Sequence, residues 1–355
     1  MNSDLTLVID FGSGLVKAGF AGSDSPSLVF PTIFRKQRNS KGSEFIIGEA
    51  GQPYSDSLYR SPIERSVICD MNGLESIIRY IYSTLGIKGD SNHVLLTKPP
   101  GCDSKQLEDL TQYFLETLYS PSISFISSAT LSLISTGSVT GLVCECGYGV
   151  TNVVPIFESY GLEHARVTTL IGGCDVDSQL RSLLTKIGMS ENDNDAVREV
   201  KEQLCYVRTS VEQPDPLPTA YEPPNGRQLM IGNERYLGPE VLFDPSLINI
   251  NGTGISNSIS TSIDRCDNFL CRELLPNIVI SGGSTMFQGM AERIENDIGN
   301  IVKKKVKVIA TPERKYGAWV GGSIFASTSV FEQFQITKQD WANEGDKIFR
   351  YKSFM

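Results

Sequence analysis

The sequence predicts an α/β protein made of two related domains that face one shared ligand. In residues 5–20 a buried strand ends at an acid, a Gly-Ser-Gly turn follows, and a second strand leaves the turn. Residues 142–157 repeat this pattern, and Glu145 follows Asp10 by 135 positions, as the glycines of the second turn follow those of the first. Matched turns this far apart indicate related domains. Strands that alternate with helices indicate a layered α/β architecture.

Each turn carries groups that suit a phosphate. Glycine tolerates positive φ, and the backbone N–H groups of such a turn can form an anion-binding concavity. In the first turn Ser13 adds a hydroxyl and Lys17 a cation. Asp10 places a carboxylate where a phosphate-bound Mg²⁺ could lie. A single turn is equally typical of an ordinary hairpin, so the prediction of a phosphate chain held between two loops depends on the second copy.

Composition excludes several classes of protein. A chain of 355 residues favours about two domains. The net charge is −9 without a basic stripe, which excludes nucleic acid as a partner. The eight cysteines show no metal-ligand spacing, and we expect Cys144 and Cys146 to be reduced, buried thiols. No apolar run approaches the ~18 residues of a membrane span, and the charged N-terminus is unlike a signal peptide. We therefore expect a soluble intracellular protein without membrane insertion.

Further strands and helices alternate along the chain. Asn72 and Glu75 resemble a capping box, an apolar stripe follows, and Gly86 ends that helix. Residues 255–270 resemble one helix and residues 214–224 a Pro-rich loop. We expect strands at residues 94–97, 123–126 and 277–281, and helices at residues 104–118, 129–135, 175–184, 196–207, 284–294 and 316–328.

Two glycine pairs have specific interpretations. Gly282 and Gly283 follow a strand and precede a predicted helix, a third arrangement compatible with a phosphate or nucleotide. Gly321 and Gly322 lie inside the last of these helices, where each glycine costs roughly 1 kcal/mol. A close approach by another backbone would explain that second pair.

Six segments carry a resemblance to a known family. They are DFGSGLVKAGFAG (10–22), LSLISTGSVTGLV (131–143), VKEQLCYV (200–207), IGNERY (231–236), SGGSTMFQG (281–289) and PERKYGAWVGGSI (312–324). Together they resemble actin, in unbroken order from about residue 5 to the C-terminus. The chain is similar to a divergent actin or to an actin-related protein of conventional length.

The resemblance implies the actin/Hsp70/sugar-kinase superfold, with two related α/β domains around a nucleotide cleft. One domain would comprise residues 1–135 and 317–355, with a small subdomain at about 32–61. The other would comprise residues 136–316, with a small subdomain at about 172–250. The resemblance also implies ATP or ADP with Mg²⁺, filament assembly, and a cytoplasmic, cytoskeletal location.

The resemblance assigns a site residue by residue. The phosphates would be held by Gly12, Ser13, Gly14, Leu15 and Lys17 from one side and by Gly147 and Gly149 from the other. The ribose would be met by Gly173 and Asp175, and the nucleoside would be framed by Lys201, Glu202, Gly282, Gly283, Ser284, Met286 and Lys315. Asp10 and Glu145 would hold the metal through waters. Without the resemblance, Lys201 and Glu202 are more typical of a solvated helix face.

The chain departs from actin where hydrolysis takes place. Ser128 stands where actins carry a Gln that positions the attacking water, and Asn152 stands where they carry a His near it. The second loop, which in actins reads Asp-Ser-Gly-Asp-Gly, has Glu145, Cys146 and Tyr148 at its altered positions. Positioned proton-transfer groups typically contribute 10²–10⁴-fold. We therefore expect hydrolysis to be slow or absent, with binding retained.

Assembly is expected to be weak. Residues 31–62 resemble a small appendage with a mobile loop, and its segment 38–42 is short and polar where actins have an apolar tip. The loop at 247–251, which helps to join filament strands in actins, alternates Asn with Ile. Partners would be the chain itself or other actins. Actin-binding proteins would dock in a cleft near Ile134, Tyr160 and Phe331.

Two alternatives remain open. The first is a non-polymerising actin-like scaffold or filament-end cap with little nucleotide dependence. The second is a phosphotransferase of the same superfold, such as a sugar kinase, which would need a catalytic Asp beside a sugar site. No such Asp is evident outside the nucleotide loops, and fold alone does not settle function.

Overall fold

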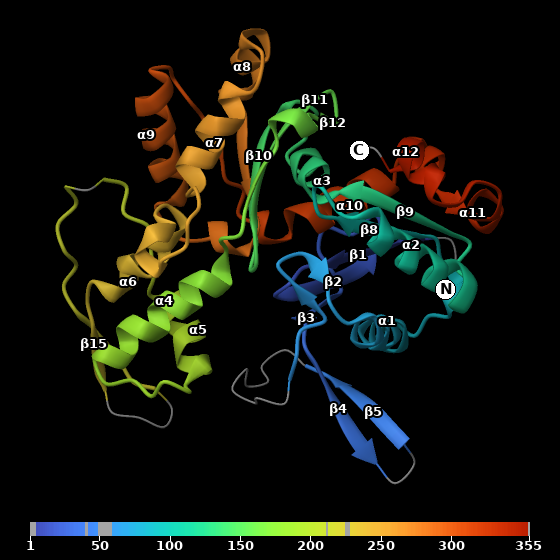
Figure 1. Ribbon diagram of the computed structural model, residues 1–355, viewed down its shortest axis with the longest axis horizontal. Helices are drawn as coiled ribbons and strands as arrows, with labels where there is room; N and C mark the ends of the chain where they lie inside the picture. The colour runs from blue at the N-terminus through green and yellow to red at the C-terminus, as the bar shows by residue number, and fades with distance from the viewer. Residues whose placement is uncertain (1–4, 40–41, 49–58, 211, 224–227, 354–355) are drawn as a thin grey trace.

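The structure is a computed structural model that describes residues 5–39, 42–48, 59–210, 212–223 and 228–353. Its two largest sheets have six strands each and lie side by side (Figure 1). The predicted α/β class is confirmed. The first sheet runs in the order β18 (Ile336–Thr337), β9 (Ser122–Ser127), β8 (Val94–Lys98), β1 (Leu7–Phe11), β2 (Leu15–Phe20) and β3 (Leu28–Pro31).

Strand β1 forms the centre of the first sheet because both of its faces are apolar. It pairs in parallel with β8 and antiparallel with β2, in a register that sets Asp10 opposite Lys17. Side chains alternate between the faces of a strand. Leu7 and Ile9 therefore pack in one core with helices α1 (Met71–Leu85) and α2 (Ser104–Gln112). Val8 packs on the opposite side with the aromatic side chains of the C-terminal segment.

Helix α1 begins two residues earlier than its sequence suggests. Asp70 is the N-cap residue, and its side chain accepts a hydrogen bond from the Gly73 N–H at 3.0 Å. The predicted capping box of Asn72 and Glu75 is therefore wrong, because an acid just upstream satisfies the free N–H group first. Gly86 ends the helix in the left-handed conformation at φ 65°, as expected.

The second sheet repeats the design of the first. It runs in the order β12 (Tyr160–Gly161), β11 (Thr151–Phe157), β10 (Gly141–Cys146), β16 (Ile278–Ser281) and β17 (Val308–Ile309), and β13 (Val167–Thr169) pairs with β11. The β10–β11 hairpin sets Glu145 opposite Asn152, as β1–β2 sets Asp10 opposite Lys17. Cys144 and Cys146 are buried in this core as free thiols, as expected.

Helices α4 (Gly173–Lys186), α5 (Asn194–Gln203), α7 (Ile255–Asp264) and α9 (Met290–Val302) contribute to the second core. Helix α5 ends four residues before its predicted end. Residues 255–270 form two helices, α7 and α8 (Asn268–Leu274), rather than one. A short 3₁₀ turn follows Gly282, and α9 begins only at Met290, so the predicted helix start at Ser284 is wrong.

Helices α3 (Ser128–Ile134) and α10 (Gly317–Ala326) lie between the two sheets (Figure 1). A Cβ atom at Gly321 would lie 1.8 Å from the carbonyl oxygen of Leu131, and one at Gly322 would lie 2.9 Å from a methyl carbon of Val8. The predicted close backbone approach is confirmed. Because α3 contacts strands of both sheets, this glycine-mediated contact fixes the helix that joins the two halves.

Smaller elements project from the sheets. β4 (Phe34–Asn39) and β5 (Gly42–Ile47) form a hairpin within the predicted appendage, β6 (Ile63–Glu64) and β7 (Val67–Ile68) form a second, and β14 (Thr219–Tyr221) pairs with β15 (Leu229–Ile231). The remaining helices are α6 (Glu234–Leu237), α11 (Lys338–Glu344) and α12 (Phe349–Lys352). Residues 214–224 thus include a strand, and residues 40–41 and 49–58 of the predicted mobile loop lie outside the described residues.

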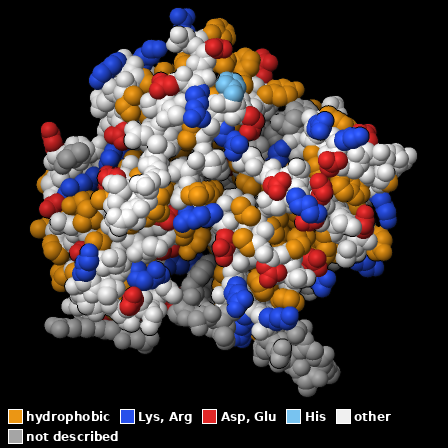
Figure 2. All heavy atoms as spheres, viewed as in Figure 1, with side chains coloured by type: hydrophobic (Ala, Val, Ile, Leu, Met, Phe, Trp, Pro, Cys, Tyr) orange, Lys and Arg blue, Asp and Glu red, His pale blue; other side chains and the backbone are white. Residues whose placement is uncertain are grey.

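The surface differs from one expectation for the first strand. Leu5, predicted to be part of the buried first strand, lies before β1 and is 42% exposed. Basic and acidic side chains are interspersed over the face shown in Figure 2. Among the described helices, none has the length and apolar character needed to cross a bilayer.

Candidate functional site

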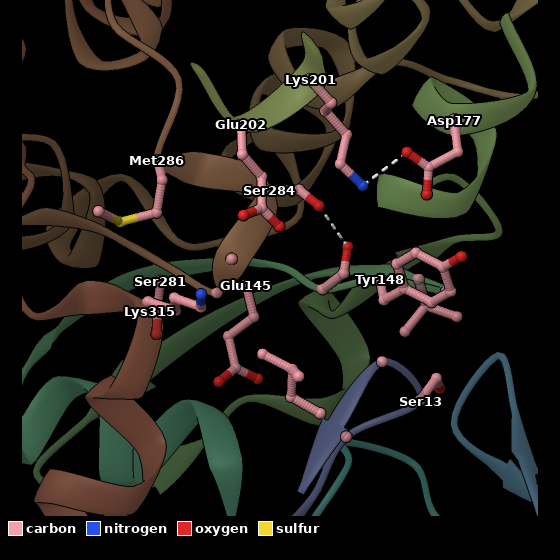
Figure 3. A pocket seen from close by; sticks show the side chains of 18 of the residues that line it. Ser13, Glu145, Tyr148, Asp177, Lys201, Glu202, Ser281, Ser284, Met286 and Lys315 are labelled. Atoms are coloured by element: carbon pink, nitrogen blue, oxygen red, sulfur yellow. Dashed lines mark hydrogen bonds and ion pairs between the residues drawn. The ribbon is translucent and has the colours of Figure 1, made fainter. Parts of the chain in front are cut away.

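A cavity of about 760 Å³ opens where the β1–β2 turn faces the β10–β11 turn (Figure 3). The predicted site residues that line it are Asp10, Gly12, Ser13, Gly14, Leu15, Lys17, Ser128, Glu145, Gly147, Gly149, Asn152, Lys201, Glu202, Gly282, Gly283, Ser284, Met286 and Lys315. Its lining holds five Lys or Arg side chains and four Asp or Glu side chains. In a chain whose net charge is −9, this excess of cations favours an anionic ligand.

The first loop is held rigidly around Asp10. One carboxylate oxygen accepts a hydrogen bond from Lys17 Nζ at 2.7 Å, and the other accepts one from the Thr97 hydroxyl at 2.6 Å. The Lys17 and Asp10 side chains are each only 13% exposed. The Gly12 N–H donates to the Leu15 carbonyl at 3.2 Å and closes the turn. The two charges predicted to meet a phosphate and its cation therefore pair with each other.

The glycines of the two loops are required for a reason that the sequence did not suggest. Gly14 and Gly149 are not among the residues with positive φ. A Cβ atom at Gly14 would instead lie 2.8 Å from the Cβ of Tyr148, and one at Gly149 would lie 2.8 Å from the Cα of Arg65. A side chain at Gly14 would therefore push the two loops apart, and one at Gly149 would push the second loop away from the segment that carries Arg65.

The second loop is bound to the start of helix α4. The Gly173 N–H donates to the Gly147 carbonyl at 3.0 Å, and the Cys174 N–H donates to the Tyr148 carbonyl at 2.8 Å. The Ser284 hydroxyl also donates to the Gly147 carbonyl at 2.7 Å. Gly282, at φ 94°, lets the third turn approach this loop, since a Cβ there would lie 2.3 Å from the Cys146 carbonyl oxygen. Three separate segments thus converge at the same end of the cavity.

Glu145 is held by two serines of helix α3. Its two carboxylate oxygens accept hydrogen bonds from the Ser128 hydroxyl at 2.7 Å and the Ser132 hydroxyl at 2.8 Å. Burial raises the pKa of Glu145 to about 7, although both hydrogen bonds act to lower it, and the nearby Asp10 raises it further. Ser132 was not predicted from the sequence. Its spacing of one helical turn from Ser128 was the available signal.

Asn152 is also turned toward a partner. Its side-chain oxygen accepts a hydrogen bond from the Thr168 hydroxyl at 2.7 Å, and the residue is only 4% exposed. The two side chains at the expected water-positioning places, Ser128 and Asn152, are therefore each engaged by a neighbour.

The nucleoside end of the cavity is lined by ion pairs. Lys201 points toward Asp177 (Figure 3), and its Nζ atom lies 2.6 Å from an Asp177 oxygen and 5.5 Å from the centre of the Tyr148 ring. Glu202 accepts a hydrogen bond from Arg198 at 3.1 Å. The Lys201–Asp177 pair is largely shielded from water at 13% and 14% exposure. Lys201 is thus more than the solvated helix residue that its sequence context alone suggested.

Gly173 and Asp175, expected beside the ribose, do not line the cavity. Asp175 is 4% exposed and accepts a hydrogen bond from the Gly172 N–H at 2.9 Å. A capping interaction of this kind explains its position at the start of α4. Its assignment to the ribose remains a prediction.

Arg65, which was not predicted from the sequence, binds the second loop although it does not itself line the cavity. It lies at the tip of the β6–β7 hairpin and donates hydrogen bonds to the Gly149 carbonyl at 2.8 Å and the Leu170 carbonyl at 2.9 Å. It also pairs with Asp175 at 2.9 Å, and this hydrogen bond is the main reason that the pKa of Arg65 is raised. Arg65 and Ser66 have positive φ values of 44° and 66°, a costly conformation for residues with side chains.

The expected docking cleft has one buried member. Tyr160 is 54% exposed, whereas Phe331 is only 3% exposed and packs edge-on against Phe325. Ile134 packs beside the same core cluster. Phe331 therefore supports this region from the inside, and a docking cleft near these three residues remains a prediction.

Comparison with known proteins gives consistent results. The family model named Actin matches residues 1–192 and 189–354. The chain is 37% identical over 365 residues to centractin of Schizosaccharomyces pombe, an alignment that covers 97% of this chain and 96% of that protein.

Proposed function

The chain belongs to the actin family, and from this premise we propose that its cavity binds ATP or ADP. Membership of this family supports an actin-like cytoskeletal role. The observation that supports nucleotide binding most directly is the cavity of about 760 Å³ between two glycine loops with an excess of cationic side chains. Ligand pockets typically measure about 300–1,000 Å³. Backbone N–H groups of such loops suit a phosphate chain.

The proposal includes slow or absent hydrolysis. A group that orients the attacking water must reach it by a hydrogen bond. Ser128 donates its hydroxyl hydrogen to Glu145, and Asn152 uses its side-chain oxygen to accept from Thr168. Both contacts favour a cleft that retains ATP rather than one that turns it over.

A phosphate-release assay tests this part of the proposal. The purified chain is loaded with ATP, and inorganic phosphate is followed over time. We expect little release from the wild-type chain and faster release from the double variant Ser128→Gln, Asn152→His. Actin-like release by the wild-type chain would refute the proposal of a disabled hydrolytic step.

The proposal also includes weak self-assembly and actin partners in the cytoplasm. In the 247–251 loop, Leu247 is 44% exposed, whereas Ile248 and Ile250 pack against the second core. Only part of the apolar surface of this loop is therefore available to a neighbouring subunit. Pelleting in Mg²⁺ and salt distinguishes a filament-forming protein from the non-polymerising scaffold or cap. Sedimentation of most of the chain would contradict weak assembly.

The division into two domains belongs to the same proposal. Residues 1–135 with 317–355 would form one domain and residues 136–316 the other. The two largest core clusters support this division, since one draws on residues 7–125 and 336–349 and the other on residues 142–308. Limited proteolysis tests it. Cleavage within either cluster before cleavage between them would contradict the division.

A further inference from the structure

The family implies Mg²⁺ beside the nucleotide, but the oxygen donors of this cleft do not fit a tightly held divalent cation. Mg²⁺ binds through one or two carboxylates, substrate phosphates and several retained waters in a near-octahedral arrangement. Four described acids line the cavity. Asp177 and Glu202 are engaged by Lys201 and Arg198 at the nucleoside end. Asp10 and Glu145 alone remain for a cation at the phosphate loops.

All four oxygens of these two carboxylates already accept hydrogen bonds. Asp10 receives them from Lys17 at 2.7 Å and Thr97 at 2.6 Å, and Glu145 receives them from Ser128 at 2.7 Å and from a second serine of α3 at 2.8 Å. The charge of Asp10 is also neutralised by Lys17 in a pair that is 13% exposed on each side. Each oxygen therefore has one acceptor position left for the waters on a cation, and the existing contacts fix the direction of that position.

Tyr148 occupies a position of the second loop where a third acidic side chain could have faced the cation. We call the part of the cavity beside Tyr148 the corner. The resemblance implies an acid at this position. In the structure an aromatic ring stands there, so close to the first loop that a Cβ at Gly14 would lie 2.8 Å from the Cβ of Tyr148. The ring also lies 5.5 Å from Lys201 Nζ. This neutral side chain supplies no carboxylate to a divalent cation or its waters, and the nearby Lys201 is already paired with Asp177.

The cavity has its own means to balance a phosphate chain. Of the five cationic side chains that line it, Arg181 and Lys315 lie outside the described ion pairs, and backbone N–H groups of glycine loops suit phosphate. We propose that this cleft holds its nucleotide without a tightly bound divalent cation, the phosphate charge being met by the protein's cationic side chains and backbone amides. The inference depends on the proposed nucleotide binding.

The test measures dissociation of a fluorescent etheno-ATP from the full chain, chased with ATP in excess Mg²⁺ or in EDTA. We expect the two dissociation rates to agree within about threefold. Acceleration by EDTA of more than about tenfold would overturn the inference while leaving the proposed function intact. Absence of etheno-ATP and ATP binding in both buffers would overturn both.

Tyr148→Asp and its neutral isostere Tyr148→Asn provide a matched pair of variants. The first returns a carboxylate to the corner, and the second removes the ring without adding charge. We expect EDTA to accelerate dissociation from Tyr148→Asp by about tenfold and from Tyr148→Asn by no more than about threefold. Equal insensitivity of both variants would refute the role given to the missing acid.

Discussion

Replacing Gly321 by alanine tests the contact that joins the two halves of the molecule. The added Cβ would lie 1.8 Å from the carbonyl oxygen of Leu131 and 2.5 Å from its carbonyl carbon. These are backbone atoms of α3, so no side-chain rotation relieves the contact. Helix α3 also carries Ser128 and Ser132, which bind Glu145. A displacement of α3 is therefore transmitted to the cleft.

The expected magnitude follows from two opposing effects. Helix propensity alone favours alanine over glycine by roughly 1 kcal/mol. Overpacking a tightly packed interior costs about 1–3 kcal/mol, and the clash at Gly321 belongs at the upper end of that range because a backbone must move. We expect a net loss of about 2 kcal/mol in the free energy of unfolding.

Gly299 supplies the control, since it also lies within a helix. A Cβ at Gly299 would meet nothing closer than the Lys304 carbonyl oxygen at 3.7 Å, which is an ordinary contact. Gly299→Ala is expected to raise the stability by up to about 1 kcal/mol. Urea denaturation followed by circular dichroism measures both variants. A Gly321→Ala variant as stable as the wild-type chain would refute the packing argument.

Three further predictions concern the cleft and the core. Because burial raises the pKa of Glu145 from 4.5 to about 7, the stability that its proton contributes is complete below about pH 4.5 and lost as the pH rises through 7. The free energy of unfolding of Glu145→Gln should therefore exceed that of the wild-type chain by about 2 kcal/mol at pH 8 and equal it at pH 4.5. Urea denaturation over this pH range measures both, and the same pH dependence in the two proteins would contradict the prediction. Arg65→Gln leaves the nearly buried Asp175 with fewer partners and should cost about 1–2 kcal/mol. Lys105→Gln, at an exposed ion pair, should leave the stability unchanged in the same assay, and equal losses would count against the cleft contact. Trp319→Phe removes a buried N–H donor to strand β1 and should lower the free energy of unfolding by about 2 kcal/mol. A variant with the same urea midpoint as the wild-type chain would contradict this prediction.

The hairpins at both loops could be predicted from the sequence because their signal is local. An apolar run, an acid and a Gly-x-Gly turn occupy a few neighbouring residues, and the second copy repeats their order. The glycines, however, were explained by positive φ, whereas Gly14 and Gly149 serve the approach of distant segments. A close approach between loops far apart in the sequence leaves no local pattern.

Arg65 could not be predicted for the same reason. Its partners Gly149 and Asp175 follow it by 84 and 110 residues, and its own neighbours resemble an ordinary polar hairpin. Phe331 shows the converse limit. The resemblance to actin placed Phe331 near the docking cleft but gave no information about how exposed its side chain is. That exposure depends on how the aromatic side chains around Phe331 pack.

The nucleotide content and turnover of one purified sample test the central claim most directly. Denaturation releases whatever the cleft holds, chromatography identifies it, and phosphate production is followed on the remaining native protein. We predict that ATP is bound and that it persists without conversion to ADP. An empty cleft that takes up no added nucleotide would contradict nucleotide binding, and conversion of bound ATP to ADP at an actin-like rate would contradict the role given to Ser128 and Asn152.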